Sequence, residues 1–136
     1  MTLFLRRLLR ALSRNHAETA IDDRDPRLRG RTYAIPFEYV WQAASSLANG
    51  GLRRWHITGS DDTEGVIHAE AKTLVFRFVD DVVIDVKLDY DAQTRVDMQS
   101  KSRKGAIDFG ANARRIGRFF RTLDRKLNPP VKKARR

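Results

Sequence analysis

The spacing of hydrophobic and polar positions changes several times along the chain, and each change predicts a new element. Residues 3–14 place apolar side chains on one helical face and arginines on the other. The apolar set is Phe4, Leu5, Leu8, Leu9 and Leu12, and the polar face holds Arg6, Arg7 and Arg10. We therefore expect residues 1–14 to form a basic amphipathic helix.

The following segment, residues 15–31, is polar and charged and contains Pro26 and Gly30. This composition is typical of a connection between folded parts, so the segment is predicted to be a linker. A folded domain is expected from residue 32 to residue 128, and residues 129–136 are expected to form a basic tail.

The predicted domain opens with a short strand at residues 32–35, and Pro36 then begins a helix. One stripe of this helix follows the i, i+3, i+4, i+7 spacing of a buried face: Phe37, Val40, Trp41, Ala44, Leu47 and Ala48. Gly50 and Gly51 are predicted to end the helix, because glycine tolerates the left-handed conformation found there.

Strict alternation then predicts four more strands. The inward positions are Trp55 and Ile57, then Ile67, Ala69 and Ala71 with Leu74, Phe76 and Phe78 continuing the pattern, then Val82, Ile84, Val86 and Leu88, and finally Val96 and Met98. Residues 61–65 are acidic and end in glycine, which predicts a hairpin turn. That turn would place His56 opposite Glu70 and Thr58 opposite His68 on the outer face.

A last helix is predicted from about Ala111 to Leu127. Its buried face is Ile116, Phe120, Leu123 and Leu127, with Phe119 at the edge, and its basic surface is Arg114, Arg118, Arg121 and Arg125. The order β-α-β-β-β-β-α with hairpin-length connections predicts an α+β fold. We expect an antiparallel sheet of about five strands with two helices on one face, preceded by the N-terminal amphipathic helix.

Charge is concentrated at the two ends of the chain. The total is +10, with +3 in residues 1–30, −2 in residues 31–110 and +9 in residues 111–136. A basic end attracts an anionic surface such as lipid headgroups, nucleic acid or an acidic protein. The chain has no cysteine, which excludes disulfides, thiolate metal sites and a cysteine nucleophile.

The densest polar stretch is residues 100–116, where the last strand leads into the last helix. An anion or partner group could be held there by Ser102, Arg103, Asp108, Asn112 and Arg115. A structural role is the alternative that we favour, with Asp108 or Asn112 capping the helix and Arg103 pairing with Asp108 or with Asp80 and Asp81.

Signals for catalysis or metal binding are weak. His56, His68 and Glu70 on one face could hold a divalent ion, but cross-strand His–Glu pairs are more often solvated surface pairs. No serine lies in a nucleophile elbow, and no P-loop or dinucleotide-binding motif is present. The chain is therefore predicted to be no enzyme and to carry no metal and no cofactor.

A family resemblance rests on the same stretch. The pattern S-R-x-G-x-x-D-x-G-x-N-x-x-R-I, which begins at Ser102, resembles the family called domain of unknown function 1499. Phe78, Asp80–Val82 and the helix around Val40–Trp41 also fit that family, so the resemblance covers about residues 32–124. It implies a small α+β domain of bacteria and photosynthetic eukaryotes and assigns no activity.

The charge pattern favours a non-catalytic accessory or interaction domain, attached peripherally to an anionic membrane surface or to a membrane protein complex. No stretch approaches the roughly 20 apolar residues of a membrane span, so we expect a cytoplasmic protein on the cytoplasmic face of a membrane. Three roles are compatible with the sequence of the N-terminal helix: an anchor, a docking element or a cleaved targeting peptide. The alternatives are nucleic-acid binding through the basic C-terminal helix, and binding of a lipid or small ligand between sheet and helices.

Overall fold

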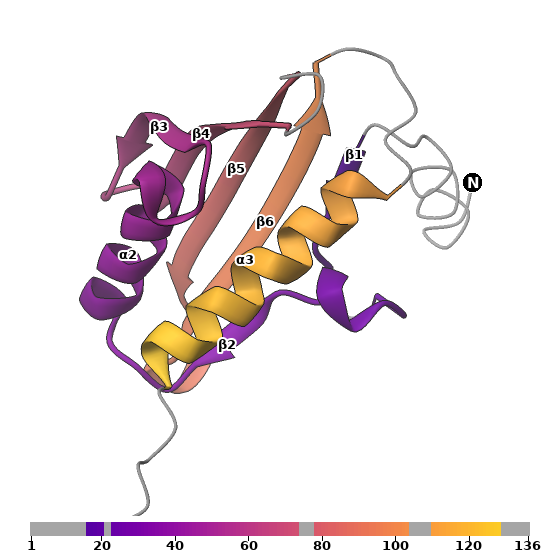
Figure 1. Cartoon of the computed structure of the whole chain (residues 1–136). Helices are drawn as coiled ribbons and strands as arrows, with labels where there is room; N and C mark the ends of the chain where they lie inside the picture. The colour runs from indigo at the N-terminus through magenta and orange to yellow at the C-terminus, as the bar shows by residue number, and fades with distance from the viewer. Residues whose placement is uncertain (1–15, 21–22, 74–77, 104–109, 129–136) are drawn as a thin grey trace, which may run out of the picture.

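One antiparallel sheet forms a layer of the molecule, and two helices cover one of its faces (Figure 1). The computed structural model describes residues 16–20, 23–73, 78–103 and 110–128. The strands are β1 (His16–Glu18), β2 (Arg31–Tyr33), β3 (Trp55–Asp61), β4 (Val66–Lys72), β5 (Val79–Leu88) and β6 (Thr94–Ser102), and the helices are α2 (Phe37–Ser46) and α3 (Ala111–Leu127). The predicted α+β fold is confirmed. The predicted helix at residues 1–14 and the tail at 129–136 lie outside the described residues.

The strand order places four consecutive strands side by side. β3, β4, β5 and β6 form an antiparallel meander in which each strand pairs with the next. The other edge of β6 is shared by two short strands: β1 pairs with residues 99–101, and β2 pairs with residues 94–96. The described sheet therefore has six strands, one more than the sequence pattern predicts.

The additional strand corrects the prediction of a linker at residues 15–31. β1 lies within that segment, and a 3-10 turn at Pro26–Leu28 packs against α3. Ala17 and Leu28 are half-buried against the core. The physical reason is the edge of β6, which would otherwise present a row of unpaired N–H and C=O groups that β1 and β2 now satisfy.

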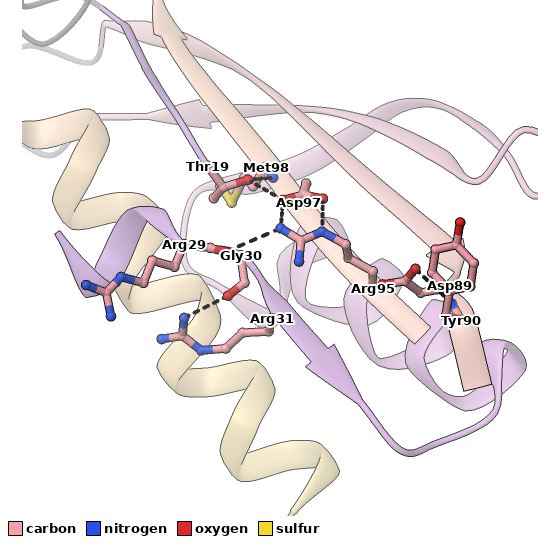
Figure 2. A network of polar contacts seen from close by, with 9 residues as sticks. All are labelled: Thr19, Arg29, Gly30, Arg31, Asp89, Tyr90, Arg95, Asp97 and Met98. Atoms are coloured by element: carbon pink, nitrogen blue, oxygen red, sulfur yellow. Dashed lines mark hydrogen bonds and ion pairs between the residues drawn. The ribbon is translucent and has the colours of Figure 1, made fainter. Parts of the chain in front are cut away.

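Side chains reinforce this edge pairing (Figure 2). The Thr19 hydroxyl donates to Asp97 at 2.8 Å and accepts from the Met98 backbone N–H at 3.0 Å. Arg95 donates to the same Asp97 carboxylate through Nε at 2.8 Å and Nη2 at 2.9 Å, and its Nη2 also donates to the Arg29 carbonyl at 3.4 Å. These contacts tie the segment before β2 to the outward side of β6.

The alternating pattern of the strands is confirmed in β5 and β6. Val82, Ile84 and Val86 of β5 are at most 1% exposed, and Val96 and Met98 of β6 are at most 2% exposed. Leu88, which the pattern predicts to be inward, is 66% exposed. It lies at the end of the β5–β6 hairpin beside an exposed turn, where alternation no longer determines burial.

The helices bury most of the stripes that their spacing predicts, but Phe37, Trp41 and Leu127, which were predicted on the buried faces, are only partly buried. The buried side chains of α2 include Val40 and Ala44. The helix closes through a π-type turn, Leu47–Gly51, in which Leu47 and Ala48 are buried and Gly50 has φ of 98°. In α3, Ile116, Phe120 and Leu123 are fully buried as predicted. Phe119, predicted at the edge, is also fully buried because it stacks on Trp55 at 6.0 Å between ring centroids.

The β3–β4 hairpin has the predicted pairing only near its base. His56 lies opposite Glu70, as expected, and the two side chains approach to 3.2 Å. Thr58 does not lie opposite His68, because a β-bulge between Ile57 and Gly59 shifts the register so that Gly59 faces His68. A bulge inserts one residue into one strand only, so the predicted register, which holds at the base of the hairpin, is off by one residue on the turn side of the bulge.

Gly65 in the β3–β4 turn has φ of 71°, and its carbonyl accepts a hydrogen bond from the Val86 N–H at 2.8 Å, whereas a Cβ on Gly65 would overlap the Val86 carbonyl oxygen. Gly65→Ala is expected to lower the free energy of unfolding by more than about 1 kcal/mol, because it adds backbone strain and a steric overlap. Gly59→Ala, in the same hairpin with nothing within 4 Å of the added carbon, is the control. Urea denaturation of both variants checks this, and equal losses would contradict the register of β4 and β5.

Tyr33 links β2 to α3 by donating to Asp124 at 2.6 Å while being 4% exposed. Burial raises the pKa of the Tyr33 phenol, and the hydrogen bond to Asp124 adds to the increase. Because the folded pKa exceeds the unfolded value of about 10, the stabilisation is complete below that pH and is lost as the pH rises through the folded pKa.

Tyr33→Phe is expected to lower the free energy of unfolding by about 1–2 kcal/mol at pH 7, through the lost hydrogen bond to a carboxylate. Above pH ~10 the wild-type chain should lose stability more steeply than the variant. Tyr39→Phe is the matched control, because Tyr39 is 63% exposed. Urea midpoints measured from pH 7 to 11 test this, and parallel pH profiles for wild type and Tyr33→Phe would refute the assignment.

Candidate functional site

One end of the inward sheet face is polar instead of apolar. Asp80 of β5 and Ser102 of β6 are register partners there, and Ser100 lies one inward position further along β6. Asp80 is 2% exposed and Ser100 is fully buried. Buried polar groups are costly unless they are hydrogen-bonded, so this end of the core needs partners from the helix layer.

The first turns of α3 supply these partners. Asn112, which is fully buried, accepts from the Ser100 hydroxyl at 2.7 Å and donates to the Ser102 hydroxyl at 3.0 Å. Arg115 Nη1 donates to Asn112 Oδ1 at 2.9 Å and to Ser100 Oγ at 3.2 Å, and it forms an ion pair with Asp80 at 2.7 Å. We call these five residues the junction network.

The junction network fixes where α3 begins on the sheet. The Asp80 and Arg115 side chains are 3% and 12% exposed, and among the described residues no buried side-chain polar atom lacks a partner. A satisfied buried network rigidifies the elements that it joins, and losing one member leaves the rest unpaired. The exposed face of α3 is thereby held in one orientation relative to the sheet.

Arg103 lies on the opposite, outward face of the sheet. It donates to Asp81 through Nε at 2.9 Å and Nη2 at 2.8 Å, and it also pairs with Glu70, which meets His56. These hydrogen bonds raise the pKa of Arg103 above its ordinary value. The five residues predicted as one anion or partner site are therefore not brought together: Ser102, Asn112 and Arg115 meet inside, Arg103 lies outside, and Asp108 is not among the described residues.

A pocket of about 460 Å³ lies beside the junction network, between α3, the start of β3 and the end of β4. Its basic residues come from separate parts of the chain: Arg27, Arg53, Arg54, Lys72, Arg114, Arg115, Arg118 and Arg121. Its other lining residues are Leu52, Trp55, Thr73 and Ala111. No carboxylate is among the described residues that line it. We call it the basic pocket.

Two of these cations have carboxylate partners outside the lining. Arg115 pairs with Asp80, and Arg27 pairs with Asp25 at 2.6 Å, where the hydrogen bond from Arg27 lowers the pKa of the Asp25 carboxyl. Arg27 reaches the pocket across Gly117 of α3, where a Cβ would come within 2.9 Å of the Arg27 stem. Glycine at this helical position therefore lets the 3-10 turn approach α3 closely.

Three lining cations of α3 follow one helical stripe. Arg114, Arg118 and Arg121 are spaced i, i+4 and i+7, and all three are exposed. Arg125 continues the stripe and is exposed, but it does not line the pocket. The predicted basic surface of α3 thus has three members in the pocket and one beyond it.

Sequence reasoning missed Arg27, Arg53, Arg54 and Lys72, because they lie 42 to 94 positions from the pocket-lining arginines of α3 and nothing local marks them. Arg54 also has an unusual backbone conformation: its φ of 65° lies in the left-handed region, which bulky residues rarely adopt. The predicted docking residues of the N-terminal helix, Phe4 to Leu12, lie outside the described residues.

In the described part of the chain, no group of three or more His, Cys, Asp or Glu side chains is placed to hold a metal ion. None of the helices in that part is both long enough and apolar enough to cross a membrane.

The fold and the residues around residue 102 together define a small α+β domain in which the sheet-to-helix junction carries the distinctive motif. The model of a protein family described as "Protein of unknown function (DUF1499)" matches residues 10–123. The chain belongs to this family. The match begins before β1, in agreement with a domain that includes β1 and β2. No curated protein matches the chain.

The adjacent residues Asp80 and Asp81 provide a test of the junction network. Asp80→Asn should lower the free energy of unfolding by roughly 3–5 kcal/mol, because it leaves the Arg115 cation buried without its counter-charge. Asp81→Asn removes one partner from a half-exposed pair and should leave the unfolding midpoint nearly unchanged. Urea denaturation measures both, and similar midpoints for the two variants would show that the buried pair does not hold α3.

Proposed function

We propose that this protein is a non-catalytic domain that attaches peripherally to an anionic membrane surface through the exposed arginines of α3. The observation that carries the proposal is the α3 stripe of Arg114, Arg118, Arg121 and Arg125, which is exposed and continuous with further cations of the basic pocket. Each Lys or Arg near an anionic leaflet contributes on the order of 1 kcal/mol.

The division of α3 into two faces supports this assignment. Ile116, Phe120 and Leu123 are fully buried against the sheet, so the opposite face is not needed for packing. Solubility alone does not require a face of arginines, and acidic residues interspersed with them would serve it better. A cationic face held on a rigid support is suited to binding an extended anionic surface.

The lining of the basic pocket supports a binding role over a catalytic one. None of its described residues is a histidine or carboxylate that could act as a general base near neutral pH. The amphipathic pattern predicted for residues 1–14 would add a second contact with the same surface.

Co-sedimentation of the full chain with vesicles tests the proposal. The chain should bind vesicles that contain phosphatidylglycerol and not vesicles of phosphatidylcholine alone, and binding should weaken as salt increases. Arg118→Gln combined with Arg125→Gln should cost about 2 kcal/mol of binding free energy, a roughly 30-fold loss of affinity.

The matched control is Lys87→Gln combined with Lys101→Gln, which removes the same charge from exposed positions on the opposite sheet face. An equal loss for both pairs would mean that overall charge and not the α3 face determines binding. A chain lacking residues 1–14 that no longer binds, while the α3 variant binds normally, would assign attachment to the N-terminal segment and refute the role of α3.

A further inference from the structure

We propose that the basic pocket binds a phosphomonoester group, carried by a lipid headgroup or by a free phosphorylated compound. The proposal rests on the proposed function where the phosphate belongs to a lipid, and it stands by itself where the compound is free. Its starting point is the convergence of cations from four separate segments on one pocket: the 3-10 turn, the residues before β3, the end of β4 and α3.

Two walls of the pocket carry cations. Arg118 and Arg121 come from α3, whereas Arg53 lies just before β3 and Lys72 at the end of β4. Guanidinium groups present a planar fork of donors that matches the oxygens of a phosphate, and lysine adds a point charge. A phosphomonoester has three terminal oxygens and close to two negative charges at neutral pH, so it can be held from both walls at once.

The charge balance favours a doubly charged ligand. No carboxylate lines the pocket among the described residues, and carboxylates from outside it pair with Arg27 and Arg115. Concentrating like charges destabilises a folded protein through self-repulsion, so a bound anion of high charge density relieves more of this cost than a single carboxylate would.

The size and floor of the pocket indicate that the ligand is more than an ion. A volume of about 460 Å³ is within the range of small-molecule sites. Trp55 and Leu52 line it with mostly buried apolar surface, and Trp55 is held in place by stacking on Phe119. The cations would hold the phosphate while the apolar floor contacts the organic part of the ligand.

Arg54 shows that this wall is under backbone strain. Its φ of 65° is a left-handed conformation in which a bulky residue is unfavourable, and its Nε donates only weakly, at 3.4 Å, to the Lys72 carbonyl. Strained positions persist where the surrounding structure imposes them, and they concentrate at binding sites. Arg54→Gly should therefore raise the unfolding midpoint while it weakens ligand binding.

Trp55 provides a direct reporter of occupancy. The chain has two tryptophans, and the other is Trp41, which stacks on Phe37 in α2 and does not line the pocket. In the full chain with Trp41→Phe, titration with pyrophosphate at constant ionic strength should produce a saturable change in fluorescence. Inorganic phosphate should compete with it, and chloride should not.

Paired variants of equal charge test the location of the site. Arg118→Gln with Arg121→Gln, and separately Arg53→Gln with Lys72→Gln, should each weaken pyrophosphate binding at least about tenfold, as expected for lost hydrogen bonds to a charged ligand. Arg125→Gln with Lys126→Gln, on α3 outside the pocket, should change the affinity less than about threefold. Thermal melts confirm folding of each variant, and losses of similar size in all three pairs would overturn the proposal.

Vesicles of equal surface charge distinguish the two sources of phosphate. A lipid ligand predicts tighter binding to phosphatidic acid, a phosphomonoester, than to phosphatidylglycerol, a phosphodiester, and the Arg118/Arg121 variant should lose this preference. If pyrophosphate binding depends on the pocket but the chain does not prefer one kind of anionic vesicle, the ligand is a free phosphorylated compound.

The remaining outcomes separate this proposal from the proposed function. Equal binding to both anionic vesicles, without saturable pyrophosphate binding, would refute the phosphate site and leave peripheral membrane attachment intact. Pyrophosphate binding that depends on Arg118 and Arg121, in a chain that binds no vesicle, would support the phosphate site and refute peripheral membrane attachment. Displacement of pyrophosphate by a short RNA, with a steep salt dependence of RNA binding, would make the pocket part of a nucleic-acid interface and would also overturn the proposal.

Discussion

The buried ion pair between Arg115 and Asp80 is the contact on which the arrangement of the molecule depends. It joins the first turns of α3 to β5, and Asn112, Ser100 and Ser102 satisfy the polar atoms that remain around it. A buried pair of this kind contributes little net stability compared with apolar packing, but it permits few alternative arrangements. It therefore determines how α3 is placed more than how strongly it is held.

The placement of α3 decides what the rest of the sequence can form. With its apolar stripe on the sheet, its arginines face the segment that precedes β3 and the end of β4, and cations distant in sequence become neighbours. Arg115 belongs to both regions, because it pairs with Asp80 and also lines the basic pocket. Three residues of the family motif, Ser102, Asn112 and Arg115, thus belong to a structural junction, and the basic pocket lies next to it.

Elements with a clear hydrophobic periodicity were predictable: the bounds of α3 at Ala111–Leu127 and the inward positions Val82, Ile84 and Val86 of β5 agree with the structure. β1 was missed because a three-residue polar strand has no period of its own and exists only through the open edge of β6. The bulge at Gly59 likewise has no local signal. For the site, the α3 arginines were predicted, whereas Arg53 and Lys72 could be recognised only after the fold had brought them to the same pocket.

A backbone and indole ¹H–¹⁵N NMR titration of the full chain with pyrophosphate tests the central claim most directly, because it reports on every region at once. Phosphate binding in the basic pocket predicts saturable shifts confined to residue 27 and to residues 52–55, 72–73 and 111–121, with the Trp55 indole among the largest. Shifts spread evenly over exposed cations, including Lys87 and Lys101 on the far sheet face, would show that charge attracts phosphate without a site and would contradict the account.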